Sequence, residues 1–186
     1  LSVKWATCNV GASKPENYGD YFAWGETRPK STYNLSTYKW YKLSIEDEDN
    51  YTKYCADSFY GTEDNKEQLD ISDDAARANW GGSWRMPTRD ELIELRQKCT
   101  WTWTTQNGVK GYKVTSKTNG RSIFLPAAGF RYDSSLNDAG SNGGYWSSSI
   151  GTRYPGIAGC VYFDLGGVGW CNDGRDCGLS VRPVCP

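Results

Sequence analysis

The chain has 186 residues, with 21 Lys and Arg against 22 Asp and Glu and no His. This length fits one domain, and the balanced charge disfavours a nucleic-acid binder, whose surface is usually strongly basic. The absence of His excludes His-based acid–base catalysis, His-ligated zinc and the Ser-His-Asp triad. The longest apolar run, around residues 123–130, is far shorter than the roughly 18 residues of a spanning helix, so we expect no membrane insertion.

Aromatic residues make up 15% of the chain, with 9 Trp and 13 Tyr. Such a composition favours sheets and loops over helices. Each Trp or Tyr side chain buries a large apolar area and keeps one polar group. We therefore expect aromatic packing to supply much of the core.

The chain contains seven cysteines, without a CxxC spacing: Cys8, Cys55, Cys99, Cys160, Cys171, Cys177 and Cys185. This number fits an oxidising compartment better than a zinc site. Because it is odd, at least one thiol is free, bound elsewhere or paired between molecules, and the spacing does not reveal the pairing. The sequence begins at Leu1 without a signal peptide, so we expect any targeting segment to have been removed.

The N-terminal third is expected to contain little regular structure. Residues 1–7 alternate and predict a first strand that ends at the Asn9-Val10-Gly11 turn. Residues 15–70 are polar and lack periodicity, which predicts an irregular insertion. Its acidic run at 46–49 lacks the spacing of an EF-hand, so a solvated loop is a simpler interpretation than a calcium site.

Two helices and a hairpin follow. Residues 72–78 begin at Ser72, a capping residue, and predict a short helix that stops at Gly81-Gly82. Thr88 and Glu91 form a capping-box pattern that predicts a second helix to about Lys98. Residues 111–116 and 121–125 flank an Asn-Gly pair and predict a β-hairpin.

The composition changes near residue 132. Residues 1–131 contain 22 Lys, Glu and Gln, and residues 132–186 contain none. This last part still alternates as strands whose inward residues are Val161, Phe163, Val168 and Trp170. The outward residues mix small, aromatic, acidic and thiol side chains in no pattern that a sheet surface requires, which indicates that folding did not select them.

Several segments resemble a known family. Residues 81–88 (GGSWRMPT), which lead into a helix, resemble the corresponding segment of C-type-lectin-like domains of the formylglycine-generating-enzyme type. A wider set of blocks is similar to the Fibrobacter succinogenes major paralogous domain: residues 3–11 (VKWATCNVG), 21–26 (YFAWGE), 124–129 (FLPAAG), 145–149 (YWSSS) and 180–184 (SVRPV). The resemblance covers nearly the whole chain.

This resemblance implies an α+β, C-type-lectin-like fold in a single domain over 1–186, with two short helices, antiparallel sheets and long irregular loops. Some family members, from Bacteroidetes or their phages, are variable proteins of diversity-generating retroelements. Their hypervariable stretch lies between the blocks that correspond to residues 145–149 and 180–184, so residues 150–179 are the expected variable region.

Such retroelements randomise adenines in codons such as that for Asn. The products include Gly, Asp, Tyr, Ser, Cys, Ile, Arg and Leu, but not Lys, Glu, Gln, Met or Trp. Three of the seven cysteines would then be products of diversification. The resemblance gives sixteen candidate ligand-binding positions: Gly151, Arg153, Tyr154, Gly156, Ile157, Gly159, Cys160, Tyr162, Asp164, Gly169, Cys171, Asn172, Asp173, Gly174, Asp176 and Cys177.

The implied function is display of a variable surface that binds a protein or glycan on a cell surface, without catalysis, cofactor or metal. The implied location is extracellular, on an outer-membrane surface with or without a lipid anchor, or on a phage virion; the oligomeric state stays open. Tyr154 and Tyr162 are expected either as binding anchors or as cover for the sheet. The scaffold tryptophans are expected to be Trp5, Trp24, Trp84, Trp146 and Trp170.

Three alternatives remain. A calcium-dependent carbohydrate-binding lectin is one, although the Glu-Pro-Asn and Gln-Pro-Asp triplets are absent and Cys171 interrupts the Trp-Asn-Asp pattern. A copper-dependent oxidase of the formylglycine-generating type is another, since Cys171 and Cys177 are two thiols that Cu(I) accepts as ligands. Drift in a Gly- and Asn-rich loop region is a third explanation of the composition.

Overall fold

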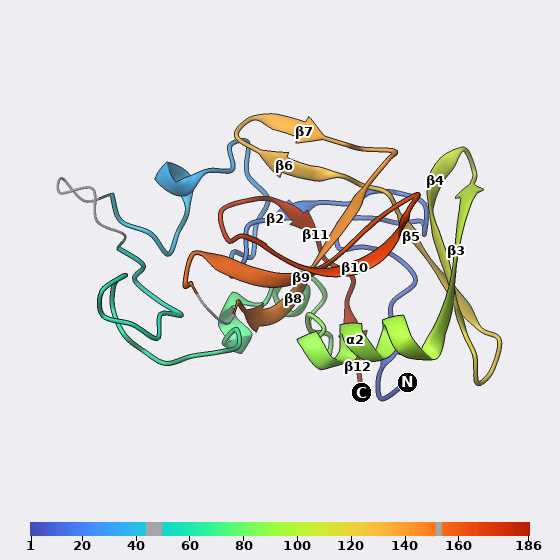
Figure 1. The fold of residues 1–186 in the computed structure, drawn as a ribbon, viewed down its shortest axis with the longest axis horizontal. Helices are drawn as coiled ribbons and strands as arrows, with labels where there is room; N and C mark the ends of the chain where they lie inside the picture. The colour runs from blue at the N-terminus through green and yellow to red at the C-terminus, as the bar shows by residue number, and fades with distance from the viewer. Residues whose placement is uncertain (44–49, 152–153) are drawn as a thin grey trace.

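The computed structural model describes residues 1–43, 50–151 and 154–186. Two α-helices and several mainly antiparallel sheets in this part of the chain confirm the predicted mixed α+β class (Figure 1). The helices are α1 (Ala75–Trp80) and α2 (Arg89–Lys98), and two 3-10 turns, η1 (Leu35–Thr37) and η2 (Ile71–Asp73), accompany them. No helix among the described residues has the length and apolar character needed to cross a membrane.

The central sheet has five strands in the order β10, β9, β8, β11, β2. Their bounds are Tyr21–Phe22 for β2, Gly143–Ile150 for β8, Ile157–Asp164 for β9, Gly167–Gly174 for β10 and Leu179–Ser180 for β11. Neighbours are antiparallel except β8 and β11. Strands β9 and β10, which the alternation of their apolar residues predicts, pair as a hairpin at one edge of this sheet.

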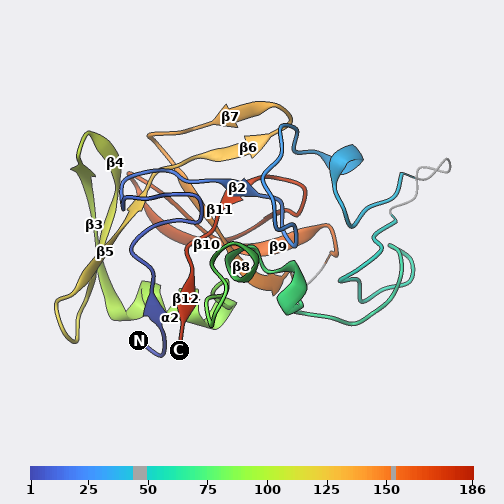
Figure 2. The same ribbon diagram turned by 180° about the vertical axis from the view of Figure 1, so that it is seen from behind.

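Smaller sheets surround the central one. A second sheet contains β3 (Cys99–Gln106), β4 (Val109–Ser116) and β5 (Ser122–Pro126). Two strand pairs complete the set, β6 (Phe130–Tyr132) with β7 (Ser135–Asn137) and β1 (Lys4–Trp5) with β12 (Val184–Cys185). The second sheet and the loops of residues 50–70 lie at opposite sides of the molecule in both views (Figures 1 and 2).

Helix α2 begins as predicted. The Thr88 hydroxyl accepts the Glu91 N–H at 3.3 Å, and the Glu91 carboxylate accepts the Thr88 N–H at 2.8 Å. Helix α1 begins three residues later than predicted, because Asp74 rather than Ser72 caps it by accepting the Arg77 N–H. It ends at Trp80, before Gly81 at a positive φ of 66°.

The predicted hairpin is present as β4 and β5, but its turn differs. Asn119 and Gly120 belong to a four-residue turn, closed by a bond from the Ser116 N–H to the Arg121 carbonyl. The two-residue Asn-Gly turn lies instead at Asn107 and Gly108, both at positive φ, and joins β4 to β3, a strand the sequence analysis did not predict.

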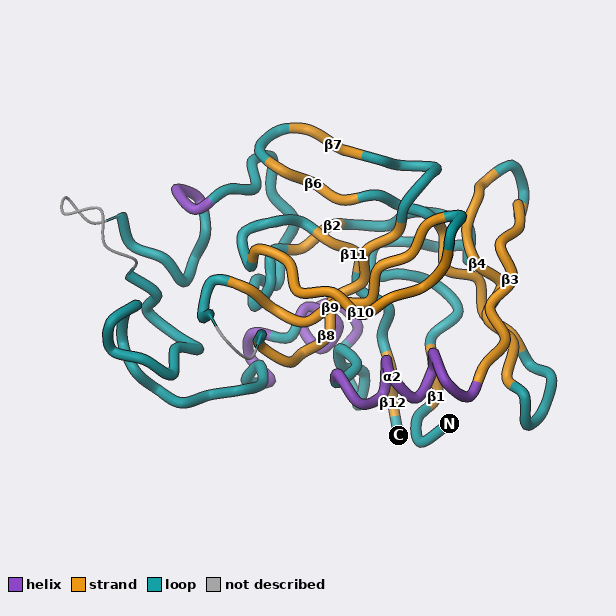
Figure 3. Tube along the Cα trace, in the orientation of Figure 1, coloured by secondary structure: helices purple, strands orange, loops and turns teal. Residues whose placement is uncertain are grey.

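The predicted first strand over residues 1–7 is reduced to the two residues of β1. Within residues 15–70, the described part contains only β2, η1 and isolated bridges, and Figure 3 shows most of it as loop. The acidic run at 46–49 lies outside the described residues.

Aromatic side chains form much of the core, as expected. Trp24 and Trp146 are fully buried, and their indole N–H groups donate to the carbonyls of Ser147 and Phe22 at 2.8 and 2.7 Å. These bonds join β2 to β8 and satisfy the polar atom that each buried indole carries. The other expected scaffold tryptophans, Trp5, Trp84 and Trp170, are only partly buried.

Candidate functional site

The β9–β10 hairpin has separate inward and outward faces at its turn end. Val161 and Phe163 are buried, and the Phe163 ring lies 5.3 Å from that of Tyr112 in the core. Tyr162 is 36% exposed, and Asp164 and Gly169 are half-buried. Tyr162 pairs across the sheet with Gly169 and Gly144, which carry no side chains to cover it. This end therefore presents Tyr162 outward, as predicted.

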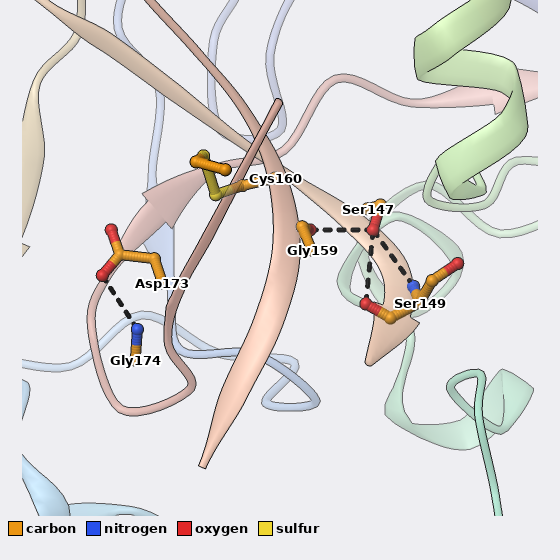
Figure 4. The surroundings of a disulfide bond; sticks show 7 residues. Ser147, Ser149, Gly159, Cys160, Asp173 and Gly174 are labelled. Carbon is orange, nitrogen blue, oxygen red and sulfur yellow. Dashed lines mark hydrogen bonds between the residues drawn. A yellow bond between two sulfur atoms is a disulfide. The ribbon is translucent and has the colours of Figure 1, made fainter. Parts of the chain in front are cut away.

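The other end of the hairpin corrects the prediction. Cys160 is fully buried and forms a disulfide with Cys171 on the paired strand (Figure 4). Gly159 is also buried; the Ser147 hydroxyl donates to its carbonyl at 2.8 Å, and a Cβ placed on it would collide with the Trp170 ring. The outward orientation expected for Cys160 is wrong, because a core cluster that contains Trp24 and Trp146 covers its face of β9 at this end.

Further candidate glycines are sterically constrained. A Cβ at Gly151 would collide with Ile157, and one at Gly156 would collide with Tyr154 and Tyr51. Both glycines are buried. A Cβ at Gly169 meets no atom within 4 Å, so that position accepts a side chain. Of the sixteen candidates, Gly151, Gly156, Gly159, Cys160 and Cys177 are thus buried, Arg153 lies outside the described residues, and the other ten are exposed or half-buried.

The disulfide leads to a stability prediction. Replacing Cys160 and Cys171 together by Ala is expected to lower the free energy of unfolding by about 2–3 kcal/mol, because an unfolded chain without the short closed loop has more conformational entropy. Urea denaturation of the variant and of the parent under oxidising conditions measures this difference. In reductant, the free energy of unfolding of the parent should approach that of the variant. Equal stability of the oxidised parent and the variant would contradict the Cys160–Cys171 disulfide.

Seven candidate residues converge on one hollow of about 610 Å³. It lies where the start of β9, the end of β10 and the loop after β10 meet η1 and β6. The seven candidates that line it are Tyr154, Gly156, Ile157, Asp173, Gly174, Asp176 and Cys177. Its remaining lining comes from segments that the sequence analysis did not connect with the site: Asn34, Leu35, Ser36, Tyr51 and Tyr132.

The hollow has an acidic wall. Asp173 accepts the Gly174 N–H at 2.8 Å, as Figure 4 shows, and burial raises the pKa of its carboxyl. Burial also raises the pKa of Asp176, and the charges of Asp173 and Asp133 add to this effect. Burial, together with the charges of Asp173 and Asp176, raises the pKa of the Cys177 thiol to about 12, which keeps it protonated at neutral pH. Cys177 is therefore a poor nucleophile here.

These pKa directions predict a stability effect. A carboxyl whose pKa is raised in the folded protein favours folding below its ordinary value of 3.8, and this contribution is lost as the pH rises through the folded value. The double variant Asp173→Asn, Asp176→Asn should therefore be at least as stable as the parent at neutral pH, although Lys30 offsets part of the effect at Asp176. Urea denaturation should show that the stability of the variant relative to the parent is smaller at about pH 4 than at about pH 7. A relative stability that grows at about pH 4 would contradict the raised pKa values.

Arg175, between the two aspartates, was not among the candidates. It is fully buried, and its guanidinium donates to the carbonyls of Pro155, Lys53 and Tyr54 at 2.7, 3.0 and 3.3 Å and to the Tyr38 hydroxyl at 2.9 Å. These bonds fix the loop after β10 to the N-terminal irregular segment. No local signal reveals this role, because the partners lie more than 100 residues away in sequence or belong to the backbone.

A second hollow, of about 530 Å³, lies between residues 56–68 and the start of α2. Lys66, Glu67, Arg89 and Asp90 line it together with the candidates Gly151 and Tyr154. Lys66 is already paired with Asp70 at 2.6 Å, and Arg89 lies over the Trp170 ring at 5.1 Å. Its mixed charges favour no single ligand class.

The described residues also bear on the metal-based alternatives. Cys171 is bonded to Cys160, so it is not available with Cys177 as a thiolate pair in this structure. Within residues 1–43, 50–151 and 154–186, no three His, Cys, Asp or Glu side chains gather as a metal site. Comparison of the chain with protein-family models, curated proteins and solved structures gave no match, so the site is interpreted from its own geometry.

Proposed function

We propose that this protein is a binding protein whose C-terminal region, residues 150–179, presents a variable recognition surface on a C-type-lectin-like scaffold. The observation that carries the proposal is the convergence of five half-buried candidates on one hollow, next to buried residues that hold the backbone; the five are Tyr154, Ile157, Asp173, Gly174 and Asp176. Tyr162, Asp164 and Gly169 extend the surface at the far end of the hairpin. Binding by shape and charge is the activity, and the ligand is a macromolecule on a cell surface.

The separation of roles within the hairpin supports variability. Phe163 and Val161 pack in the core, whereas Tyr162 and Asn172 are exposed and Gly169 faces open space. Exposed substitutions usually change stability by less than about 0.5 kcal/mol, so such positions can change without loss of the fold. The buried candidates belong to the framework instead of the variable set.

Tyr154 and Tyr162 have different environments within this proposal. Tyr162 stands between glycines and is available as a binding anchor. Tyr154 packs edge-on against the rings of Tyr51 and Tyr60 at 6.1 and 5.2 Å, and it lines both hollows. We propose that Tyr154 both shapes the two hollows and contacts the ligand.

The DNA of the locus tests the proposal. A retroelement origin requires a nearby reverse transcriptase gene and a near-copy of codons 146–184 that differs only at adenines. We expect the differences at codons of the exposed and half-buried positions, such as Tyr162, Asp164 and Asn172. A locus without such a copy, or with differences spread evenly over the codons of Val161 and Phe163, would refute the variable surface.

A further inference from the structure

The strongest additional feature is the chemistry of the 610 Å³ hollow. Its volume lies within the range of about 300–1,000 Å³ that is usual for ligand pockets. Its lining combines two acidic residues, Asp173 and Asp176, with aromatic residues that include Tyr132 and Tyr154. Tyr132 is 51% exposed and Tyr154 is half-buried, so both rings are accessible from the opening.

Among the residues that the structure describes, the two carboxylates have no cationic partner in contact. In the described part of the chain, no Lys or Arg lies within 4.0 Å of either Asp173 or Asp176. Lys30 acts on the pKa of Asp176 only through its charge, and its ammonium is held by Glu26 at 2.9 Å. Arg175 lies between them in sequence but points into the core, where carbonyl oxygens and aromatic rings surround it.

A partner with a positive charge complements this arrangement in two ways. Carboxylates form short, charge-assisted hydrogen bonds with ammonium and guanidinium groups. Phenol rings attract the same cations over their faces. An acidic glycan would be repelled by both aspartates, and a neutral glycan would leave them buried without a counter-charge.

We propose that the hollow receives a basic side chain, Arg or Lys, of a protein ligand, with Asp173 and Asp176 as its counter-charges and Tyr132 and Tyr154 as its aromatic walls. This inference rests on the proposed function, since it names the ligand chemistry of the same surface. The remaining outward residues of the hairpin then contact the surroundings of that side chain.

The test is an NMR titration of the full chain with N-acetyl-arginine amide, followed through the backbone amides. The neutral isostere N-acetyl-citrulline amide serves as the matched ligand. We expect the arginine derivative to shift the amide signals of Gly156 and Gly174. The citrulline derivative should bind at least about tenfold more weakly. Equal binding of the two, or shifts confined to other parts of the chain, would overturn the proposal.

Two variants test whether the carboxylates of the hollow bind the arginine derivative. Asp173→Asn with Asp176→Asn should weaken binding of the arginine derivative by about tenfold or more, and retained urea stability shows that the variant is folded. Glu16→Gln with Glu63→Gln, outside both the hollow and residues 150–179, also removes two negative charges and should leave binding unchanged. Loss of binding in both variants, or in neither, would contradict the site.

Failure of this inference is distinguishable from failure of the proposed function. If the locus contains the adenine-substituted copy but arginine does not bind, only the basic-ligand subsite is wrong. If arginine binds and the locus lacks the copy, the subsite stands and the variable surface is wrong.

Discussion

Replacing Arg175 by Met is expected to lower the free energy of unfolding by about 3–5 kcal/mol, although the residue lies within the proposed variable region. Removal of the guanidinium leaves two buried carbonyls and one part-buried carbonyl without their donor, and each buried loss costs about 1–3 kcal/mol. The aromatic rings of Trp24, Tyr38, Tyr51 and Tyr54, each within 5.6 Å of the guanidinium carbon, lose the same partner. Urea denaturation measures the change.

Arg131→Met is the matched control. The Arg131 side chain lies over the Tyr21 ring at 5.2 Å but is only half-buried, so its loss should change stability by about 1 kcal/mol or less. If Arg175→Met is no more destabilising than Arg131→Met, Arg175 does not hold the loop after β10, and the hollow has no fixed wall.

Phe163→Ala is expected to destabilise the protein by about 3–5 kcal/mol, as truncation of a fully buried aromatic ring usually does. Its ring packs against Tyr112, Tyr145 and Trp101 and joins the central sheet to the second one. Tyr162→Ala, the adjacent truncation on the outward face, should cost no more than about 1 kcal/mol, because its cross-strand neighbours are glycines.

Thermal or urea denaturation of the two variants tests the face assignment. A similar loss of stability in both would show that the hairpin is buried on both faces at this end. A larger loss for Tyr162→Ala would reverse the assignment.

Local signals were sufficient for several elements. The capping box at Thr88 and Glu91 fixes the start of α2, and the alternation of Val161 and Phe163 identifies the inward face of β9. Both depend on contacts or periodicity within a few residues. The Asn-Gly pair at 119–120 correctly predicts a hairpin, but it lies within a four-residue turn, and the two-residue turn is at Asn107-Gly108.

The candidate site was predictable only in part, because distant segments complete it. Alternation along β9 places Cys160 on the outward face with Tyr162, but a core cluster that includes Phe22 and Trp24 covers one end of that face. The hollow also needs Asn34 and Tyr132, and Arg175 bonds to segments far away in sequence. Such contacts follow from topology and leave no periodic trace in the sequence.

The most direct test uses a library of variants with every single substitution at residues 154–177. The variants are displayed on cells and sorted for resistance to protease, which reports folding. We predict broad tolerance at the outward positions Tyr162, Asp164, Gly169, Asn172, Asp173 and Asp176. We predict depletion at the framework positions Gly156, Gly159, Cys160, Val161, Phe163 and Arg175. Uniform tolerance across both sets, or depletion at the outward set, would contradict the separation of a fixed scaffold from a variable surface.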